Sequence, residues 1–260
     1  MDTIGMVVLS IIQGITEWLP ISSSAHLALA QHYFFGELPI IYDMGMHVGT
    51  MLAVLLYFRD RIFGMVKSVL TFNTKDREFN TALLIILGSI PTAIIGFSLK
   101  DFFVSMYNEP FFVGVALLIT ALFLFSTSRA KESNPEPNKK SSIIMGIAQG
   151  LAVAPGISRS GSTISAGLHC GLSWKEAASF SFLLAIPAIF GATLFLVLET
   201  PLDSIDYTLM GIGLIGSFIS GYASIHVLLN VISRKTFPLF ALYCAIVGVL
   251  AMILGSAPCA

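Results

Sequence analysis

Two charged residues, Glu17 and Arg159, lie in otherwise apolar stretches of the sequence, each close to side chains that carry hydroxyl groups. A charge at the centre of a membrane helix costs about 2.5–3.5 kcal/mol on insertion scales, so charges at membrane depth usually mark a function. The hydroxyls around them belong to Thr16, Ser22, Ser23, Ser24, Ser158, Ser160 and Ser162. This combination predicts a wet polar pocket. A Glu17–Arg159 salt bridge that only closes the structure is the simpler alternative, but it would not need the hydroxyls.

The two serine-rich stretches are expected to form turns from which helices return. Ser22 and Ser158 suit the N-cap position of such helices. Each helix would then point its N-terminus, with about half a positive charge, at the pocket. Exposed N–H groups, hydroxyls and the fork of Arg159 together suit an oxyanion such as phosphate. Thr163, one turn further into the second helix, offers another hydroxyl.

His26 follows Ser23 by three residues, on the face of the returning helix that the serines begin. An imidazole at this spacing can attack phosphorus as a nucleophile, or act as a base that activates a serine. The alternative is a packed, hydrogen-bonded histidine, which the nearby Glu17 and Ser23 make the weaker interpretation. The other histidines have no metal-ligand spacing and receive no role: His32, His47, His169 and His226.

A single carboxylate makes a poor cage for a metal ion. Magnesium usually binds through one or two carboxylates together with substrate phosphates and water. Gln13, one helical turn before Glu17, faces the same way and offers a neutral carbonyl oxygen. We therefore expect a divalent cation that bridges Glu17 to a substrate phosphate, and no permanent metal site without substrate.

The composition assigns these residues to an integral membrane protein. Of 260 residues, 55% are hydrophobic and 11% are charged, the mean hydropathy is +0.85 and the net charge is −1. Soluble domains carry about 25% charged residues, so a disordered chain, a nucleic-acid binder and an ordinary cytosolic enzyme are excluded. Cys170, Cys244 and Cys259 are too widely spaced for a disulfide framework. Met1-Asp2 lacks a basic region, so the first apolar run is expected to belong to the fold and not to a cleaved signal.

Six apolar stretches are near the length of about 20 residues that crosses a bilayer: 41–58, 81–99, 110–128, 178–198, 208–232 and 237–255. Two further apolar segments, 4–34 and 143–170, are broken in the middle by Pro20 and by Pro155-Gly156. Their arms of about 12–16 residues would be roughly 18–24 Å long as helices, too short to cross. The expected fold is an all-α polytopic membrane protein with six full spans and two re-entrant helical hairpins. Four glycines in 208–232, Gly211, Gly213, Gly216 and Gly221, are interpreted as close helix packing.

The loop charges predict an orientation. Basic residues gather in the loops after the first, third and fifth spans and in the loop before the fourth span. If these loops are cytoplasmic, 12 of the 14 basic residues lie on the cytoplasmic side, as the positive-inside rule expects. Only Lys100 falls outside, and Arg159 lies within the membrane. Both termini are then outside, as is the acidic loop of Glu199, Asp203 and Asp206. Residues 59–73 mix basic and apolar positions and predict an interfacial helix.

The two broken segments are related by an offset of 136 residues. Gln13-Gly14 aligns with Gln149-Gly150, and Ile21-Ser-Ser-Ser aligns with Ile157-Ser-Arg-Ser. Because the copies enter from opposite sides, this predicts an inverted-topology repeat with functional sites near the midplane. The predicted organisation is a single membrane domain, with repeat halves 1–128 and 143–260 joined by a polar cytoplasmic linker, 129–142. A duplication kept only for packing is the alternative.

The motifs Gln13-Gly-Ile-Thr-Glu-Trp-Leu-Pro-Ile-Ser-Ser-Ser-Ala-His26 and Pro155-Gly-Ile-Ser-Arg-Ser-Gly-Ser-Thr163 resemble those of the undecaprenyl-diphosphate phosphatases, the bacitracin-resistance proteins. Length, span order and linker position also match over the whole chain. The resemblance implies hydrolysis of undecaprenyl diphosphate to undecaprenyl phosphate and phosphate, recycling the lipid carrier for peptidoglycan synthesis. It also implies a Mg²⁺ or Ca²⁺ requirement and a site that serves the outer face of the bacterial plasma membrane.

The resemblance also suggests residue roles. It implies that Glu17 binds the metal, that Ser23 and His26 are the nucleophile and its partner in an order left open, and that Arg159 clamps the diphosphate. By the same match Ser158 and Thr163 contact phosphate. Ser22 and Ser160 are also predicted to bind phosphate, because of their position in the serine-rich turns and not because of the resemblance. Gln13 stands where many members carry Glu, which puts metal affinity in question. The expected partners are a polyprenyl diphosphate lipid and the bilayer, and the oligomeric state stays open, a homodimer included.

Two other functions are alternatives for a membrane protein with this pattern. A flippase or transporter of the diphosphate lipid would also use an inverted repeat around a midplane pocket, but without hydrolysis. A structural membrane subunit would not need two charged residues at membrane depth.

Overall fold

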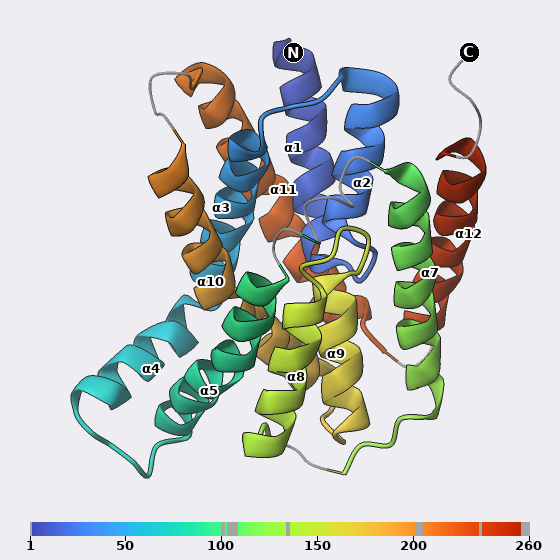
Figure 1. The fold of residues 1–260 in the computed structure, drawn as a ribbon. Helices are drawn as coiled ribbons and strands as arrows, with labels where there is room; N and C mark the ends of the chain where they lie inside the picture. Colours follow the sequence, from blue (N-terminus) through green and yellow to red (C-terminus); the bar gives the residue numbers. More distant parts are fainter. Residues whose placement is uncertain are drawn as a thin grey trace.

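The computed structural model describes residues 2–99, 102, 109–133, 136–200, 205–233 and 236–255, and its elements there are helices (Figure 1). The longer helices are α1 (Thr3–Trp18), α2 (Ser23–Ala30), α3 (Ile40–Tyr57), α4 (Arg59–Leu70), α5 (Arg77–Ser98), α7 (Pro110–Ser126), α8 (Lys139–Leu151), α9 (Arg159–His169), α10 (Trp174–Glu199), α11 (Tyr207–Val231) and α12 (Phe237–Gly255). Short helical turns follow α2 at Gln31–Phe35 and α7 at Thr127–Arg129. Six residues used in the sequence predictions lie outside the described residues: Met1, Lys100, Asp203, Arg234, Lys235 and Cys259.

The six predicted spans are confirmed. Six helices are long and apolar enough to cross a membrane, namely α3, α5, α7 with its short extension, α10, α11 and α12, and they hold 18 to 26 residues each. Two of them, α5 and α10, begin four residues earlier than predicted. Their first turns are polar and capped, because Asp76 and Ser173 accept hydrogen bonds from the backbone at their N-termini.

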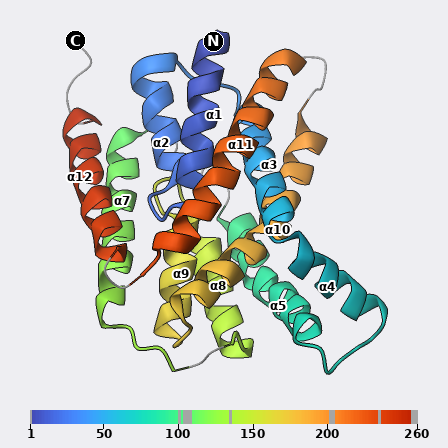
Figure 2. The same cartoon turned by 180° about the vertical axis from the view of Figure 1, so that it is seen from behind.

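Residues 59–70 form the predicted helix, α4, which packs against α5 and lies at the edge of the bundle in both views (Figures 1 and 2). Met65 and Ser68 are buried on one side of it. Phe63 and Leu70, 71% and 75% exposed, lie on another side. A helix with such an exposed apolar stripe is typical of a membrane interface; its contact with lipid stays a prediction.

The two broken segments form helical hairpins that enter the bundle from opposite ends (Figure 1). The first consists of α1 and α2, and the second of α8 and α9. Their tips meet in the interior, where Ser160 Oγ donates to the Leu19 carbonyl at 2.9 Å and the Gly156 N–H donates to Ser24 Oγ at 3.3 Å. The 16 residues of α1 and the 13 of α8 reach roughly 24 Å and 20 Å, short of a hydrocarbon core of about 30 Å. This is the geometry expected of re-entrant hairpins.

The helix packing has the pattern of an inverted repeat. The α8 helix of the second half packs against α5 of the first half, and the α1 helix of the first half packs against α11 of the second half. Each of these two contacts becomes the other when the first hairpin is matched with the second, α3 with α10, α5 with α11, and α7 with α12. The contacts α7–α12 and α3–α10 map onto themselves under the same exchange. The first turn of α1 and the last turn of α12 both lie at the upper end of Figure 1.

The glycines of the repeated Gln-Gly pair lie at equivalent helix crossings. A Cβ on Gly14 would be 2.6 Å from the Gly221 nitrogen of α11, and one on Gly150 would be 2.8 Å from Ile95 Cβ of α5. The packing role predicted for the α11 glycines is therefore confirmed for Gly221, and Gly213 and Gly216 also face close neighbours. It is wrong for Gly211, around which a Cβ would meet no atom within 4 Å.

Candidate active site

The Glu17 carboxylate lies at the centre of a small polar network, near the end of α1 and only 6% exposed. Its Oε1 accepts a hydrogen bond from Arg159 Nη2 at 2.5 Å. Its Oε2 accepts from Ser23 Oγ at 2.5 Å and from Gln13 Nε2 at 3.0 Å. Arg159 also lies over the ring of Trp18, 4.8 Å from the centroid. The ion pair considered from the sequence therefore forms, and a serine hydroxyl shares the same carboxylate.

Ser22 occupies a strained position that directs the first turn of α2 toward this network. Its φ of 70° lies in the left-handed region, which a non-glycine residue adopts at a cost of order 1–3 kcal/mol. Its hydroxyl caps α2 by accepting from the Ala25 N–H at 3.3 Å. Its carbonyl accepts from the Nδ1 of His26 at 2.7 Å. The strained turn is thus held from both sides, and Ser23 is the first residue of the helix.

The second turn is anchored by α7. Thr120 Oγ1 accepts from the Ser158 N–H at 2.9 Å and donates to the Gly156 carbonyl at 3.1 Å. Gly156 has a φ of 98°, which glycine adopts without strain. Ser158 caps α9, because its hydroxyl accepts from the Gly161 N–H at 3.0 Å. As expected from the sequence, a helix begins after each serine cap, and Arg159 is the first residue of α9.

A cavity of about 550 Å³ adjoins the network, within the usual size range of ligand pockets. The two hairpin tips contribute polar lining, namely Glu17, Ser22, Ser23, Ser24, Ser158 and Arg159, and other polar side chains such as Gln31 and Glu37 line it elsewhere. The part of its apolar lining that comes from α3 and α10 consists of Ile40, Met44, Ala185, Ala188, Ile189 and Ala192. A charged headgroup and the first part of an apolar chain could therefore lie in it together.

Four predicted site residues lie outside the cavity wall. Gln13 is fully buried behind Glu17. Ser160 and Thr163 are also buried. The Ser160 hydroxyl donates to the Leu19 carbonyl, and the Thr163 hydroxyl donates to the Arg159 carbonyl at 2.8 Å. Thr163 further bonds Ser181 of α10.

His26, the fourth, is turned toward α12. Its Nε2 bonds the Tyr243 hydroxyl at 2.7 Å, and the two rings stack at 5.6 Å with an interplanar angle of 5°. The imidazole therefore has both nitrogens occupied away from Glu17. Tyr243 gave no signal in the sequence, because nothing local places α12 beside α2.

His47, which its sequence spacing gave no role, lies on the cavity wall. Its Nε2 is 3.5 Å from Glu17 Oε2, its Nδ1 bonds the Asp43 carbonyl at 2.8 Å, and its side chain is 23% exposed. Asp43 is buried and accepts from Gln31 Nε2 at 2.8 Å. Both ionisable residues belong to a membrane span, which by itself was a signal of function.

The described residues offer few ligands to a metal ion. Within the described residues no three His, Cys, Asp or Glu side chains are grouped so that they could hold an ion. The charge of Glu17 is already balanced by Arg159. Gln13 Oε1, however, is buried without a hydrogen-bond partner, so a neutral oxygen is free beside the carboxylate. These donors fit a cation that arrives with phosphate oxygens.

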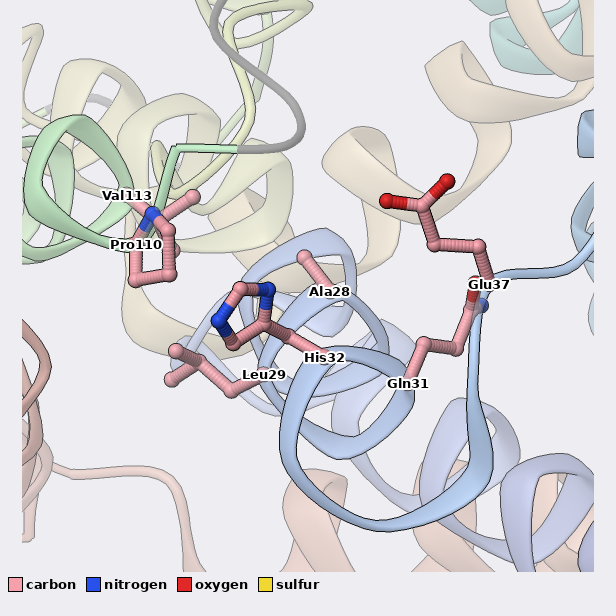
Figure 3. Close-up of a pocket in the computed structure, with 7 residues that line it drawn as sticks. All are labelled: Ala28, Leu29, Gln31, His32, Glu37, Pro110 and Val113. Carbon is pink, nitrogen blue, oxygen red and sulfur yellow. The ribbon is translucent and has the colours of Figure 1, made fainter. Parts of the chain in front are cut away.

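A second, much smaller cavity of about 20 Å³ lies at the C-terminal end of α2 (Figure 3). It has room for about one water molecule. In Figure 3 the imidazole of His32 is directed toward Pro110 and Val113, whereas Glu37 lies at the opposite side of the view. The polar groups do not converge on one point, so this cavity is not a candidate active site.

Six spans, two hairpins whose tips meet, and a buried carboxylate shared by a serine and an arginine define a polytopic membrane protein with a polar centre. The family model described as "Bacitracin resistance protein BacA" matches residues 6–250, and the chain belongs to this family. It is 40% identical over 255 residues to an undecaprenyl-diphosphatase from Syntrophotalea carbinolica, covering 95% of this chain and 97% of the relative. It is 39% identical over 259 residues to one from Korarchaeum cryptofilum, covering 96% and 98%.

Proposed function

We propose that this protein hydrolyses undecaprenyl diphosphate to undecaprenyl phosphate and phosphate, and so returns the lipid carrier to cell-wall synthesis and confers bacitracin resistance. The observation that carries the proposal is the serine hydroxyl held on a buried carboxylate, beside an arginine and two helix N-termini. Family membership and full-length similarity to undecaprenyl-diphosphatases support the same activity.

Binding of the diphosphate relies on groups from both hairpins. Arg159 donates from a planar fork that suits phosphate oxygens. The N-termini of α2 and α9 add unpaired N–H groups and partial positive charge. Ser22 and Ser158 are committed as caps, so they serve mainly by shaping these N-termini, while Ser24 on the cavity wall offers a hydroxyl.

Ser23 is the nucleophile in this proposal, with Glu17 as its general base. The hydroxyl already donates to the carboxylate at 2.5 Å, within the range for a base and its nucleophile. Ser23 Oγ attacks the terminal phosphorus while its proton passes to Glu17 Oε2. The bond to the bridging oxygen breaks, undecaprenyl phosphate leaves, and water then cleaves the phosphoserine. His26 is not a second nucleophile but holds the Ser22 carbonyl.

The polar network has oxygens that could hold a Mg²⁺ or Ca²⁺ ion together with the substrate. Glu17 would hold it, with Gln13 Oε1 as the neutral oxygen beside that carboxylate. When bound, such an ion neutralises charge that develops on the phosphate oxygens. Gln13 in place of a second carboxylate leaves the empty site without excess negative charge, which favours binding with substrate over binding alone.

The site serves the outer face of the membrane. Every described Lys and Arg except Arg159 belongs to α4, to the first turns of α5, α8 and α10, or to adjoining segments at the lower end of Figure 1. The positive-inside rule assigns that end to the cytoplasm. The cavity is lined at the opposite end by Glu37, Leu38 and Ile40, and its apolar wall between α3 and α10 gives the lipid chain a lateral way in.

The test is phosphate release from undecaprenyl diphosphate by purified protein, with Mg²⁺, with EDTA, and in Arg159→Ala. We expect cation-dependent release that falls by about a hundredfold or more in the variant, because a charge-assisted phosphate contact and the counter-ion of Glu17 are lost together. The exposed Arg129→Ala is the matched control. Well-folded wild-type protein that binds or flips the lipid without releasing phosphate would favour the transporter instead.

A further inference from the structure

The large cavity is lined by one row of side chains on α3 and one row on α10, two helices that pack against each other. The α3 row consists of Ile40, Met44 and His47, and the α10 row consists of Ala185, Ala188 and Ala192. Residues three and four apart lie on the same face of a helix, so each row follows a single face. The α3 row carries large side chains and the α10 row carries only methyl groups.

The α3 row leads from the polar network to the outside of the protein. At its inner end, His47 Nε2 lies 3.5 Å from Glu17 Oε2. Met44, about one turn away, is half-buried, and Ile40, the first residue of α3, is 48% exposed. The wall formed by α3 is therefore buried beside the carboxylate and exposed at its far end.

The α10 row shows the same change in exposure. Ala185 is fully buried and lies one turn after Ser181, which bonds Thr163 of the second hairpin. Ala188 is half-buried and Ala192 is exposed. Both rows thus become exposed with distance from the hairpin tips, so the cavity opens sideways between Ile40 and Ala192.

The length of the α10 row can be compared with the chain of a polyprenyl lipid. From residue 185 to residue 192 the helix rises about 10 Å. An isoprene unit lengthens a chain by four bonds of about 1.5 Å each, or roughly 5 Å when extended. The row is therefore as long as about two isoprene units. A cavity of about 550 Å³ also suits a ligand of drug size and not a whole undecaprenyl chain.

We infer that the α10 row recognises about the first two isoprene units of the substrate, and that Ala188 is the residue that sets the width available to them. This rests on the proposed function. With the diphosphate at the hairpin tips, the first units lie along α10 and the rest of the chain passes between Ile40 and Ala192 into the bilayer. The protein then selects its substrate by the start of the chain and not by its full length.

The small size of the α10 row is not explained by helix packing. Ala188 and Ala192 are not fully buried, so no close helix contact requires a methyl group at either position. In the same turns, Phe190 and Leu194 do not line the cavity and are 59% and 51% exposed. Large side chains are thus accepted on the outward face of this part of α10, whereas the cavity face leaves room for the methyl branches of a prenyl chain.

The variant that tests the inference is Ala188→Phe, which fills the cavity without altering a reacting group. We expect KM for undecaprenyl diphosphate to rise by at least about tenfold with kcat unchanged, because each CH₂ group displaced from an apolar site is worth roughly fourfold in affinity. Inorganic pyrophosphate, which has the head of the substrate and no chain, should inhibit wild type and variant alike. Farnesyl diphosphate, whose chain is longer than the α10 row, should lose as much as undecaprenyl diphosphate at a fixed mole fraction in detergent.

Two further variants complete the test. Gly191→Phe is the matched control, because it places the same side chain on the same helix, outside the cavity lining, where a Cβ would meet no atom within 4 Å. It should keep the KM of wild type. Ala192→Phe changes an exposed position that cannot be overpacked, so it remains informative if Ala188→Phe does not fold. We expect a smaller rise in KM, because only the outer isoprene unit loses its place.

The outcomes separate this inference from the proposed function. Folded Ala188→Phe and Ala192→Phe proteins with the KM of wild type overturn the inference. An equal loss of pyrophosphate inhibition also overturns it, because the effect would then pass through the headgroup site. Wild-type protein that releases no phosphate overturns the proposed function. Equilibrium binding of undecaprenyl diphosphate then decides the inference alone: weaker binding by Ala188→Phe than by Gly191→Phe supports it, and equal binding overturns it.

Discussion

Substitutions of His26 separate a nucleophilic histidine from one that positions the serine turn. The imidazole makes two hydrogen bonds of 2.7 Å, from Nδ1 to the Ser22 carbonyl and between Nε2 and Tyr243. In His26→Asn the amide nitrogen lies near the position of Nδ1, and in His26→Gln it reaches toward that of Nε2. We expect Asn to keep most of the activity, Gln to lose more, and Ala to lose most.

The magnitude follows from what Nδ1 holds. Its hydrogen bond is worth about 0.5–1.5 kcal/mol. The strained φ of 70° at Ser22 stores of order 1–3 kcal/mol that can relax when the bond is lost. If both are felt in the transition state, His26→Ala loses about 1.5–4.5 kcal/mol, or roughly 10- to 10³-fold in turnover. His26→Asn should stay within about tenfold of wild type.

The assay is steady-state phosphate release by detergent-purified variants that elute as folded protein. Tyr243→Phe is the matched control, because it removes only the outer hydrogen bond and should cost less than tenfold. A nucleophilic or basic His26 predicts the opposite pattern, since an amide cannot attack phosphorus and all three variants would fall to the same background. An Asn variant as inactive as the Ala variant would therefore refute the positional role.

Two further predictions concern the scaffold around the site. Gly14→Ala brings a Cβ to 2.6 Å from the Gly221 nitrogen, and such overpacking should lower the free energy of unfolding by about 1–3 kcal/mol. Thermal unfolding in detergent would measure this loss. Gly211→Ala, whose Cβ would meet no atom within 4 Å, is the control and should be near neutral. Thr120→Val leaves the buried Ser158 N–H without its acceptor and should cost about 1–3 kcal/mol and reduce phosphate release. Thr193→Val, which removes only a hydrogen bond within its own helix, is the control, and an equal effect of both valines would contradict the anchoring role.

The parts of the fold that depend on local sequence could be predicted. The apolar runs fixed the six spans to within about a turn of the helices found. The serine caps and the breaks at Pro20 and Pro155-Gly156 indicated where the hairpins turn, because capping and proline act on neighbouring residues. The repeat predicted functional sites near the midplane, and the structure brings Glu17 and Arg159 together where the two tips meet.

The contacts between distant helices could not be predicted in the same way. His26 and Ser23 are three residues apart, which places both on one side of α2, yet only Ser23 reaches Glu17. The ring of His26 turns back onto the Ser22 carbonyl and stacks on Tyr243, and that partner lies 217 residues away. His47 reaches the carboxylate because α3 packs beside α1, which no motif records.

The chemistry of the site lies where the two repeats differ. At the offset of 136, Gln13, Gly14, Ser22 and Ser24 recur as Gln149, Gly150, Ser158 and Ser160, and they pack, cap or join the hairpin tips. Ser23 instead aligns with Arg159, so that the first residues of two equivalent helices approach one carboxylate from either side, Ser23 on Oε2 and Arg159 on Oε1.

The carboxylate itself has no counterpart, because Glu17 aligns with Val153. In the proposed reaction one half therefore supplies the nucleophile and its base, and the other half supplies the arginine whose charge balances the carboxylate. Neither hairpin holds a complete site, so the proposed reaction requires the interface between the halves to be intact. For that reason a substitution that separates the tips without touching the cavity, such as Thr120→Val, is expected to impair activity as well as stability.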